Sequence, residues 1–278
     1  MLHEVIKYTF GAAVISLAVL TSCTSSEKEK LEGLLTEADN MYKSGNYSAA
    51  MRIIEELDSI SRKNPDIRRE IMHLKPKIIE QQVLAELSDN DSLIAVTTLK
   101  ADSLSRNMRF VSNPIEGYYV SRTEPSDINN TSGLYARMSP DGNFYMVATN
   151  TAKNGSNAIS VTIGGESAIS ASLPSDGERV DRSGAAEVLT FMQAECDSIG
   201  RVISRHPDEP LILTFIGRGN KSISIPQERT RAIAQVYDAA TSVTDMKKLQ
   251  IRKARLEKTL TVARSQIART MTDSTEHK

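Results

Sequence analysis

The spacing of apolar residues changes twice along the chain. Apolar residues follow a helical period from residue 31 to about residue 108, and again from 226 to 271, a stretch without glycine or internal proline. Between them, residues 109–225 form short runs rich in β-branched and aromatic residues, which is typical of strands. The pattern predicts an α+β fold: an N-terminal helical hairpin, then long antiparallel coiled-coil-like helices flanking a small antiparallel β-sandwich or open barrel.

The central region contains eight such runs, divided by turn signals such as Pro140–Gly142 and Gly164–Gly165. The runs are GYYVSR, GLYARMS, NFYMVATN, AISVTIGG, SAISASL, EVLTFM, LILTFIG and KSISI. One amphipathic helix is predicted between Gln193 and Arg205. Its apolar face would consist of Met192, Cys196, Ile199 and Ile203. We therefore expect a β-sandwich-like domain over 109–225 with one short helix inserted.

The two flanking helices carry seven-residue repeats. In 66–108, the seven-residue repeat consists of Leu87, Ile94, Ala101 and Met108, with Asp91 and Thr98 in the companion positions of the heptad. Pro76 is expected to begin a new helical segment in this region. In 226–271, spacings of four and three alternate along Leu249, Lys253, Leu256, Leu260, Ala263 and Ile267. A helix of about 45 residues would be ~65 Å long. The simplest partner for each helix is the other, which makes them two arms of a stalk, followed by a tail at 272–278.

Residues 31–65 are expected to form the helical hairpin. They resemble a single tetratricopeptide-type repeat at Ala38, Tyr42, Gly45, Tyr47, Ala50, Ile54, Leu57 and Pro65. Gly45 would supply the left-handed turn and Pro65 would end the second helix. Since one repeat cannot bury a core alone, an ordinary αα-hairpin is an equal alternative. Either form would serve in packing or partner contact.

The N-terminus has the pattern of an export signal. Lys7 precedes an apolar run of 11 residues, Phe10 to Leu20, which is shorter than the ~20 that span a membrane and fits a signal peptide. The four residues Leu20, Thr21, Ser22 and Cys23 then resemble a bacterial lipobox. A cleaved signal without lipid and a plain apolar helix are the alternatives.

The lipobox resemblance implies cleavage after residue 22 and transfer of a lipid to the thiol of Cys23, with 23–30 as a polar tether. It implies an exported protein that is lipid-anchored to the cell envelope. Because Thr24 stands where an aspartate favours inner-membrane retention, the resemblance implies the outer membrane. The mature chain is also similar to a group of Gram-negative, gut-type lipoproteins without assigned activity, in EGYYV, SPDGNFYMV, ISVTIGGESA, VLTF, AECDSIG and PLILTFIG.

Composition excludes some partners. The net charge is −1 over 278 residues, so no global field favours nucleic acid, and we expect none as a partner. Basic residues cluster only in the C-terminal helix, at Lys247, Lys248, Arg252, Lys253, Arg255 and Lys258. They indicate either an anionic partner or a solvated helix face matched by acidic residues of the other arm. Those acidic residues are Glu80, Glu86, Asp89, Asp91 and Asp102.

No motif predicts catalysis, a cofactor or a metal site. The four histidines lack metal-ligand spacing, and IGRGNKS (216–222) reads as a hairpin turn because no helix follows its lysine. Cys196 is expected to be a buried structural thiol. An Asp-Ser-apolar or Asp-Ser-Thr tripeptide recurs and resembles an O-glycosylation acceptor of exported proteins, at Ser59, Ser92, Ser103, Ser198 and Ser274.

The sequence thus favours a membrane-anchored lipoprotein with a non-enzymatic binding, assembly or structural role. Its expected partners are the membrane, through the anchor, and a protein bound by the hairpin or the coiled coil. A glycan-binding or hydrolytic envelope protein and a coiled-coil assembly subunit are the alternatives.

Overall fold

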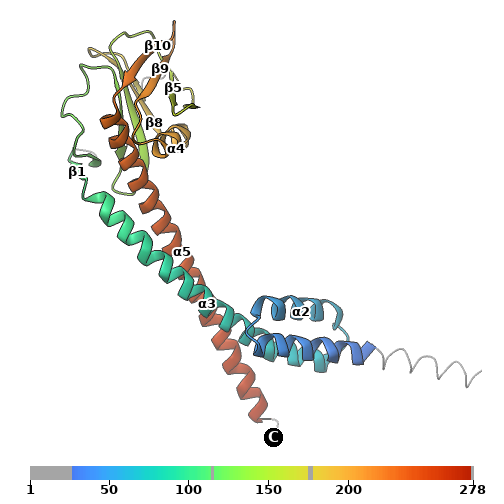
Figure 1. The fold of residues 1–278 in the computed structure, drawn as a ribbon. Coiled ribbons are helices and arrows are strands. Elements are labelled where there is room, and N and C mark those ends of the chain that lie inside the picture. Colours follow the sequence, from blue (N-terminus) through green and yellow to red (C-terminus); the bar gives the residue numbers. More distant parts are fainter. Residues whose placement is uncertain (1–26, 114–115, 175–177, 277–278) are drawn as a thin grey trace, which may run out of the picture. The chain divides into compact units, whose positions relative to one another are not determined.

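The computed structural model combines helices with antiparallel sheets, which confirms the predicted α+β class (Figure 1). It describes residues 27–113, 116–174 and 178–276, the last four of these in backbone only. Two compact units result. The first is built from the chain up to Asp91 and from Arg252 onward, and the second is Ser92–Ile251.

The first unit begins with three helical segments: residues 27–43, α2 (Tyr47–Ile60) and the start of α3 (Pro65–Ser105). Gly45 takes a left-handed φ of 80° between the first two, as predicted. The side chain of Asn46 then accepts a hydrogen bond from the Ala49 amide at 3.2 Å and caps α2. The buried core of the three segments is Leu31, Ala38, Ala50, Ile53, Ile54, Leu57, Ile67, Ile71 and Ile78.

Both proline predictions were wrong. Pro65 opens α3 instead of ending α2, which stops at Ile60. Its missing N–H costs nothing in a first helical turn, and Asn64 accepts from the Ile67 amide at 3.2 Å. Pro76 lies inside α3 and begins no new segment. Burial of Ile71 and Ile78 in the core on either side of Pro76 holds the helix through a residue that normally breaks it.

α5 (Gln227–Glu276) pairs with α3 within the first unit. Ion pairs join Glu80 to Arg264 at 2.8 Å and Glu86 to Arg252 at 3.4 Å, so the two helices run antiparallel there. Along α5, the predicted seam from Leu249 to Ile267 is half-buried or buried while most positions between are exposed. In α3 the companion position is Asn90, which is fully buried. Asp91 points outward and pairs with Lys253 at 2.9 Å, which corrects the predicted phase.

The second unit contains a six-stranded sheet in the order β1-β2-β3-β4-β8-β7 and a four-stranded sheet in the order β10-β9-β5-β6. All pairings are antiparallel. The strands of the first sheet are β1 (Met108–Val111), β2 (Tyr118–Ser121), β3 (Gly133–Met138), β4 (Phe144–Asn150), β8 (Glu187–Met192) and β7 (Val180–Asp181). Those of the second are β10 (Lys221–Ile225), β9 (Leu211–Ile216), β5 (Ala158–Ile163) and β6 (Glu166–Ile169).

Each of the eight predicted runs overlaps one of these strands, and IGRGNKS forms the β9–β10 hairpin turn as expected. β1 and β7 were not predicted. Met108 begins β1, so it does not extend the heptad of α3, which ends at Ser105. The predicted short helix consists of a 3₁₀ turn at Gln193–Glu195 and α4 (Asp197–Arg205).

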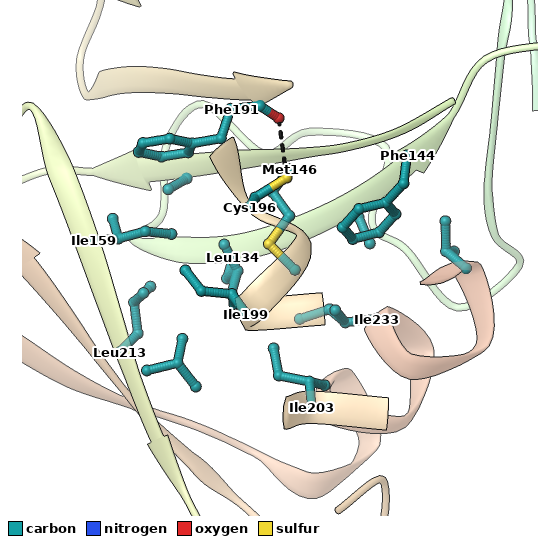
Figure 2. Close-up of a cluster of buried hydrophobic side chains, with 14 of the residues drawn as sticks. Leu134, Phe144, Met146, Ile159, Phe191, Cys196, Ile199, Ile203, Leu213 and Ile233 are labelled. Atoms are coloured by element: carbon teal, nitrogen blue, oxygen red, sulfur yellow. Dashed lines mark hydrogen bonds between the residues drawn. The ribbon is translucent and has the colours of Figure 1, made fainter. Parts of the chain in front are cut away.

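The core of the second unit takes residues from both sheets, α4 and the first third of α5 (Figure 2). Cys196 is fully buried there, and its thiol donates to the carbonyl oxygen of Phe191 at 3.3 Å (Figure 2). Burial raises the pKa of this thiol to about 12. The predicted buried thiol is therefore confirmed. Met192, by contrast, is 41% exposed and does not belong to the apolar face of α4.

Candidate functional site

A pocket opens in the six-stranded sheet where β2 and β3 diverge. The two strands pair only through Tyr119 and Met138, so the chain after β2 leaves the edge of β3. The first two turns of α5 cover the gap, which has a volume of about 240 Å³. Its lining residues are Ser121, Thr123, Glu124, Pro125, Leu134, Tyr135, Ala136, Pro226, Glu228, Arg229, Ala232 and Ile233.

Local hydrogen bonds hold both rims of this pocket. On one side, the Glu124 amide donates to the Ser121 carbonyl at 3.0 Å, and the hydroxyls of Ser121 and Thr123 lie 3.0 Å apart. On the other side, the carbonyl of Pro226 accepts from the amides of the first turn of α5. The turn after β2 and the start of α5 are thus fixed by their own backbone, and they place their side chains in the pocket.

Glu124 is the most unusual side chain of this pocket. It is only 8% exposed, and its nearest cationic atom is Arg137 Nε at 3.9 Å, which is too long for a hydrogen bond. Within the described parts of the chain, no group donates a hydrogen bond to its carboxylate. Burial raises the pKa of Glu124 to about 7, although the charges of Arg137, Arg109 and Arg229 pull it down. Its negative charge is therefore only partly compensated.

Each of the three arginines near Glu124 also contacts another group. The guanidinium of Arg137 lies 4.3 Å from the centre of the Tyr118 ring, and that of Arg229 lies 4.8 Å from the centre of the Tyr135 ring. Such cation–π contacts contribute roughly 0.5–2 kcal/mol. Arg109 Nη2 donates to the backbone carbonyl of Glu124 at 3.1 Å. The aromatic rings and the main chain thus position the arginines. Arg137 Nε faces the carboxylate at 3.9 Å, beyond hydrogen-bond distance, and is itself buried without a hydrogen-bond partner among the described residues.

A second hollow is an open groove of about 800 Å³ beside α4 and α5. Its charged groups pair with one another. Tyr237 Oη donates to Asp197 at 3.0 Å, Arg201 pairs with the same carboxylate, and Lys248 lies 3.0 Å from Asp245. Because these polar groups are already satisfied, the groove offers less to a ligand than the Glu124 pocket.

A buried polar network at the loop after β4 is structural. Glu187 is 1% exposed and accepts from Arg182 Nε at 2.7 Å and from the Ser156 amide at 3.2 Å. The side chain of Asn150 donates to the same carboxylate at 3.4 Å. This buried carboxylate has the hydrogen-bond partners that Glu124 lacks, and its role is to fix the loop between β4 and β5.

The residues predicted from the sequence as modification sites are not brought together. Leu20, Thr21, Ser22 and Cys23 lie outside the described residues. Four of the five serines are exposed on helices: Ser59, Ser92, Ser103 and Ser198. Ser274 is described in backbone only. Ser59 and Ser198 each donate to a backbone carbonyl, of Glu56 and Ile169 respectively.

The basic residues of α5 are largely matched by acidic ones. Besides the pairs with α3, Lys247 lies 3.2 Å from Asp141 and Lys248 pairs with Asp245. This favours the solvated helix face over an anionic partner.

In the parts of the chain that the structure describes, no group of three or more histidine, cysteine or acidic side chains is arranged to hold a metal. None of the described helices is both long and apolar enough to cross a membrane.

Sequence reasoning missed the Glu124 pocket. The one signal was Arg137, a charged residue inside the otherwise apolar run GLYARMS.

Comparison of the chain with protein families, curated proteins and solved structures found no match.

Proposed function

We propose that this protein is a lipid-anchored, non-enzymatic binding protein of the cell envelope, whose β-domain holds a small ligand in the Glu124 pocket. The observation that carries the binding role is a carboxylate that is 8% exposed, faces a pocket and has no hydrogen-bond donor among the described residues. A buried carboxylate in this state costs free energy unless it is paired. A ligand that pairs with it recovers that cost.

The anchor rests on the lipobox. Leu20, Thr21 and Ser22 precede Cys23 after an apolar run of signal-peptide length. A diacylglycerol on Cys23 holds the chain stably on a membrane, because two acyl chains exceed the binding of one. Thr24 favours the outer membrane as the location.

We interpret the β-domain as a sandwich instead of an open barrel. Inward-facing residues of both sheets, such as Leu134, Phe191 and Leu213, belong to a single buried core. Such a filled interior leaves the Glu124 pocket, at the edge of that core, as the place for a ligand.

The anchor is tested by growing cells with labelled palmitate. Wild type should take up the label, and Cys23→Ala should not, because no thiol remains at the cleavage site. Cys196→Ala is the matched control and should be labelled like wild type, since that thiol is buried. Equal labelling of wild type and Cys23→Ala refutes the anchor.

A second candidate is a hydrolase that acts on envelope or dietary glycans. The observation in its favour is the raised pKa of Glu124, about 7, which suits a general acid or base at neutral pH. Glu228 is the second carboxylate of the pocket. Release of reducing sugars by wild type, lost in Glu124→Gln, would favour this candidate over simple binding.

A third candidate is an assembly subunit. Leu93, Val96 and Leu99 on α3 are 50%, 66% and 72% exposed, which is unusual for a stripe of large apolar residues. The seam of α5 itself is half-buried, so this stripe is the surface on which self-association would depend. Sedimentation that changes with protein concentration would favour this candidate.

A further inference from the structure

Among the described residues that line the Glu124 pocket, the side-chain groups without hydrogen-bond partners are acceptors. Behind Glu124, the buried Nε of Arg137 also has no hydrogen-bond partner within the described chain and lies 3.9 Å from the carboxylate. Two carboxylates line it, the buried Glu124 and the exposed Glu228 at its rim. Among the described residues, none donates a hydrogen bond to either one. The pocket hydroxyls of Ser121 and Thr123 bond to each other. The one lining arginine, Arg229, lies over the ring of Tyr135.

The rest of the wall is apolar and small. It consists of Pro125, Leu134, Ala136, Pro226, Ala232 and Ile233. The volume of about 240 Å³ is below the ~300–1,000 Å³ of most small-molecule sites. The ligand must therefore be small, with a short apolar body and a polar head that donates hydrogen bonds.

The charge of the ligand's polar head decides whether it can bind beside Glu124. The raised pKa of Glu124 means that the nearby arginines do not offset its burial. A cation in direct contact would donate the missing hydrogen bond and place its positive charge closer to the carboxylate than Arg137 Nε lies. An anion would require a protonated Glu124 and would also approach the carboxylate of Glu228, so it is disfavoured.

We propose that this pocket binds the primary ammonium group of a small aliphatic amine, with Glu124 as its main acceptor and Glu228 as the second. The alkyl stem lies against the apolar wall formed by Leu134, Ala136 and Ile233. This assignment of a ligand class rests on the proposed binding role of the pocket.

Binding is linked to the ionisation of Glu124. An ammonium group binds the ionised carboxylate, whose fraction rises about tenfold between pH 6 and pH 8 for a pKa of about 7. Affinity should therefore rise by up to about tenfold over this range. The charged and titratable groups that face Glu124 are Arg109 from β1, Arg137 from β3, Tyr145 from β4, and Glu228 and Arg229 from α5. Burial raises the pKa of Tyr145 to about 12.

The test is isothermal titration calorimetry of the full chain in detergent with 1-aminopentane. The neutral isostere 1-pentanol and the anion pentanoate are titrated in parallel. Wild type should bind the amine more tightly than either analogue, and more tightly at pH 8 than at pH 6. Glu124→Gln should bind it at least tenfold more weakly and without this pH dependence. Its circular dichroism and urea midpoint verify folding.

Glu257→Gln is the matched control, because Glu257 is an exposed residue of α5 outside the pocket; it should bind like wild type. Equal amine affinity in wild type and Glu124→Gln overturns the proposal. Tighter binding of pentanol or pentanoate that depends on Glu124 overturns the amine assignment and leaves the pocket as a binding site. Absence of binding by all three compounds overturns both, while the palmitate experiment tests the anchor independently.

Discussion

The packing of α4 on α5 depends on the absence of a side chain at Gly200. A Cβ atom placed there would lie 2.3 Å from Cδ2 and 2.6 Å from Cε2 of Tyr237, and 3.0 Å from Cε1 of Phe144. Carbon atoms in contact are normally separated by about 3.5–4.0 Å. Gly200→Ala therefore forces either the ring or the helix to move.

The ring of Tyr237 has little freedom to retreat. Its hydroxyl donates to Asp197 at 3.0 Å, and its ring meets that of Phe144 edge-on at a centroid distance of 5.0 Å. Overpacking of a core costs about 1–3 kcal/mol, and so short a contact with a held ring places the cost in the upper part of that range. Alanine regains about 1 kcal/mol of helix propensity over glycine. We expect Gly200→Ala to lower the free energy of unfolding of the second unit by about 2 kcal/mol.

Urea denaturation followed by circular dichroism measures this loss, and hydrogen exchange with mass spectrometry should locate it in α4. The control is Gly33→Ala in the first helix, where an added Cβ has no heavy atom within 4 Å. This change should instead stabilise its helix by up to about 1 kcal/mol. Tyr237→Ala should reduce the cost of Gly200→Ala in a double mutant, because it removes the clashing ring. If Gly200→Ala stabilises the protein as Gly33→Ala does, the result refutes the close packing of Gly200 against Tyr237.

Two further predictions concern titratable groups. The thiol of Cys196, with its pKa raised to about 12 by burial, should resist alkylation at pH 8 in the native protein and react quickly in urea; rapid native labelling would contradict its place in the core. Hydrogen bonds with Glu166 and Glu209 raise the pKa of His206. The stability that they add is fully present below the ordinary histidine pKa of about 6.5 and is lost as pH rises through the higher pKa of the folded state. His206→Gln should therefore lower the urea midpoint more at pH 5.5 than at pH 9, and an equal loss at both would refute this coupling.

The strands that sequence predicted are those whose pattern is local. The eight runs are short, rich in β-branched and aromatic residues as a group, and divided by turn signals, so they are visible in the sequence. β7, at Val180–Asp181, has two residues and no period. β1 was hidden because Met108 also continues the helical heptad, and only its pairing with β2 decides between the two. In α3, the sequence allows the residue between Leu87 and Ile94 in the apolar repeat to be either Asn90 or Asp91. The structure decides between them, because Asn90 is buried while Asp91 points outward.

The candidate site could not be predicted in the same way. Glu124 follows a turn, and nothing in SRTEPS distinguishes it from a solvated carboxylate. Its burial arises because β2 and β3 diverge and because α5, about a hundred residues later in the chain, covers the gap. Both causes are tertiary. The lipobox, in contrast, is predicted from a contiguous motif that is visible in the sequence alone, and it stays a prediction.

The discontinuity of the first unit has a consequence for the order of folding. The core of the N-terminal hairpin uses only residues between Leu31 and Ile78, so it needs only local contacts and forms early. The ion pair between Glu80 and Arg264 instead closes a loop across 184 positions. Closure entropy makes such a contact late, unless the intervening β-domain has already folded and shortened the loop. Mutations that slow the folding of the β-domain should therefore also delay the pairing of α3 with the end of α5. This delay is expected even for mutations far from the paired parts of the two helices.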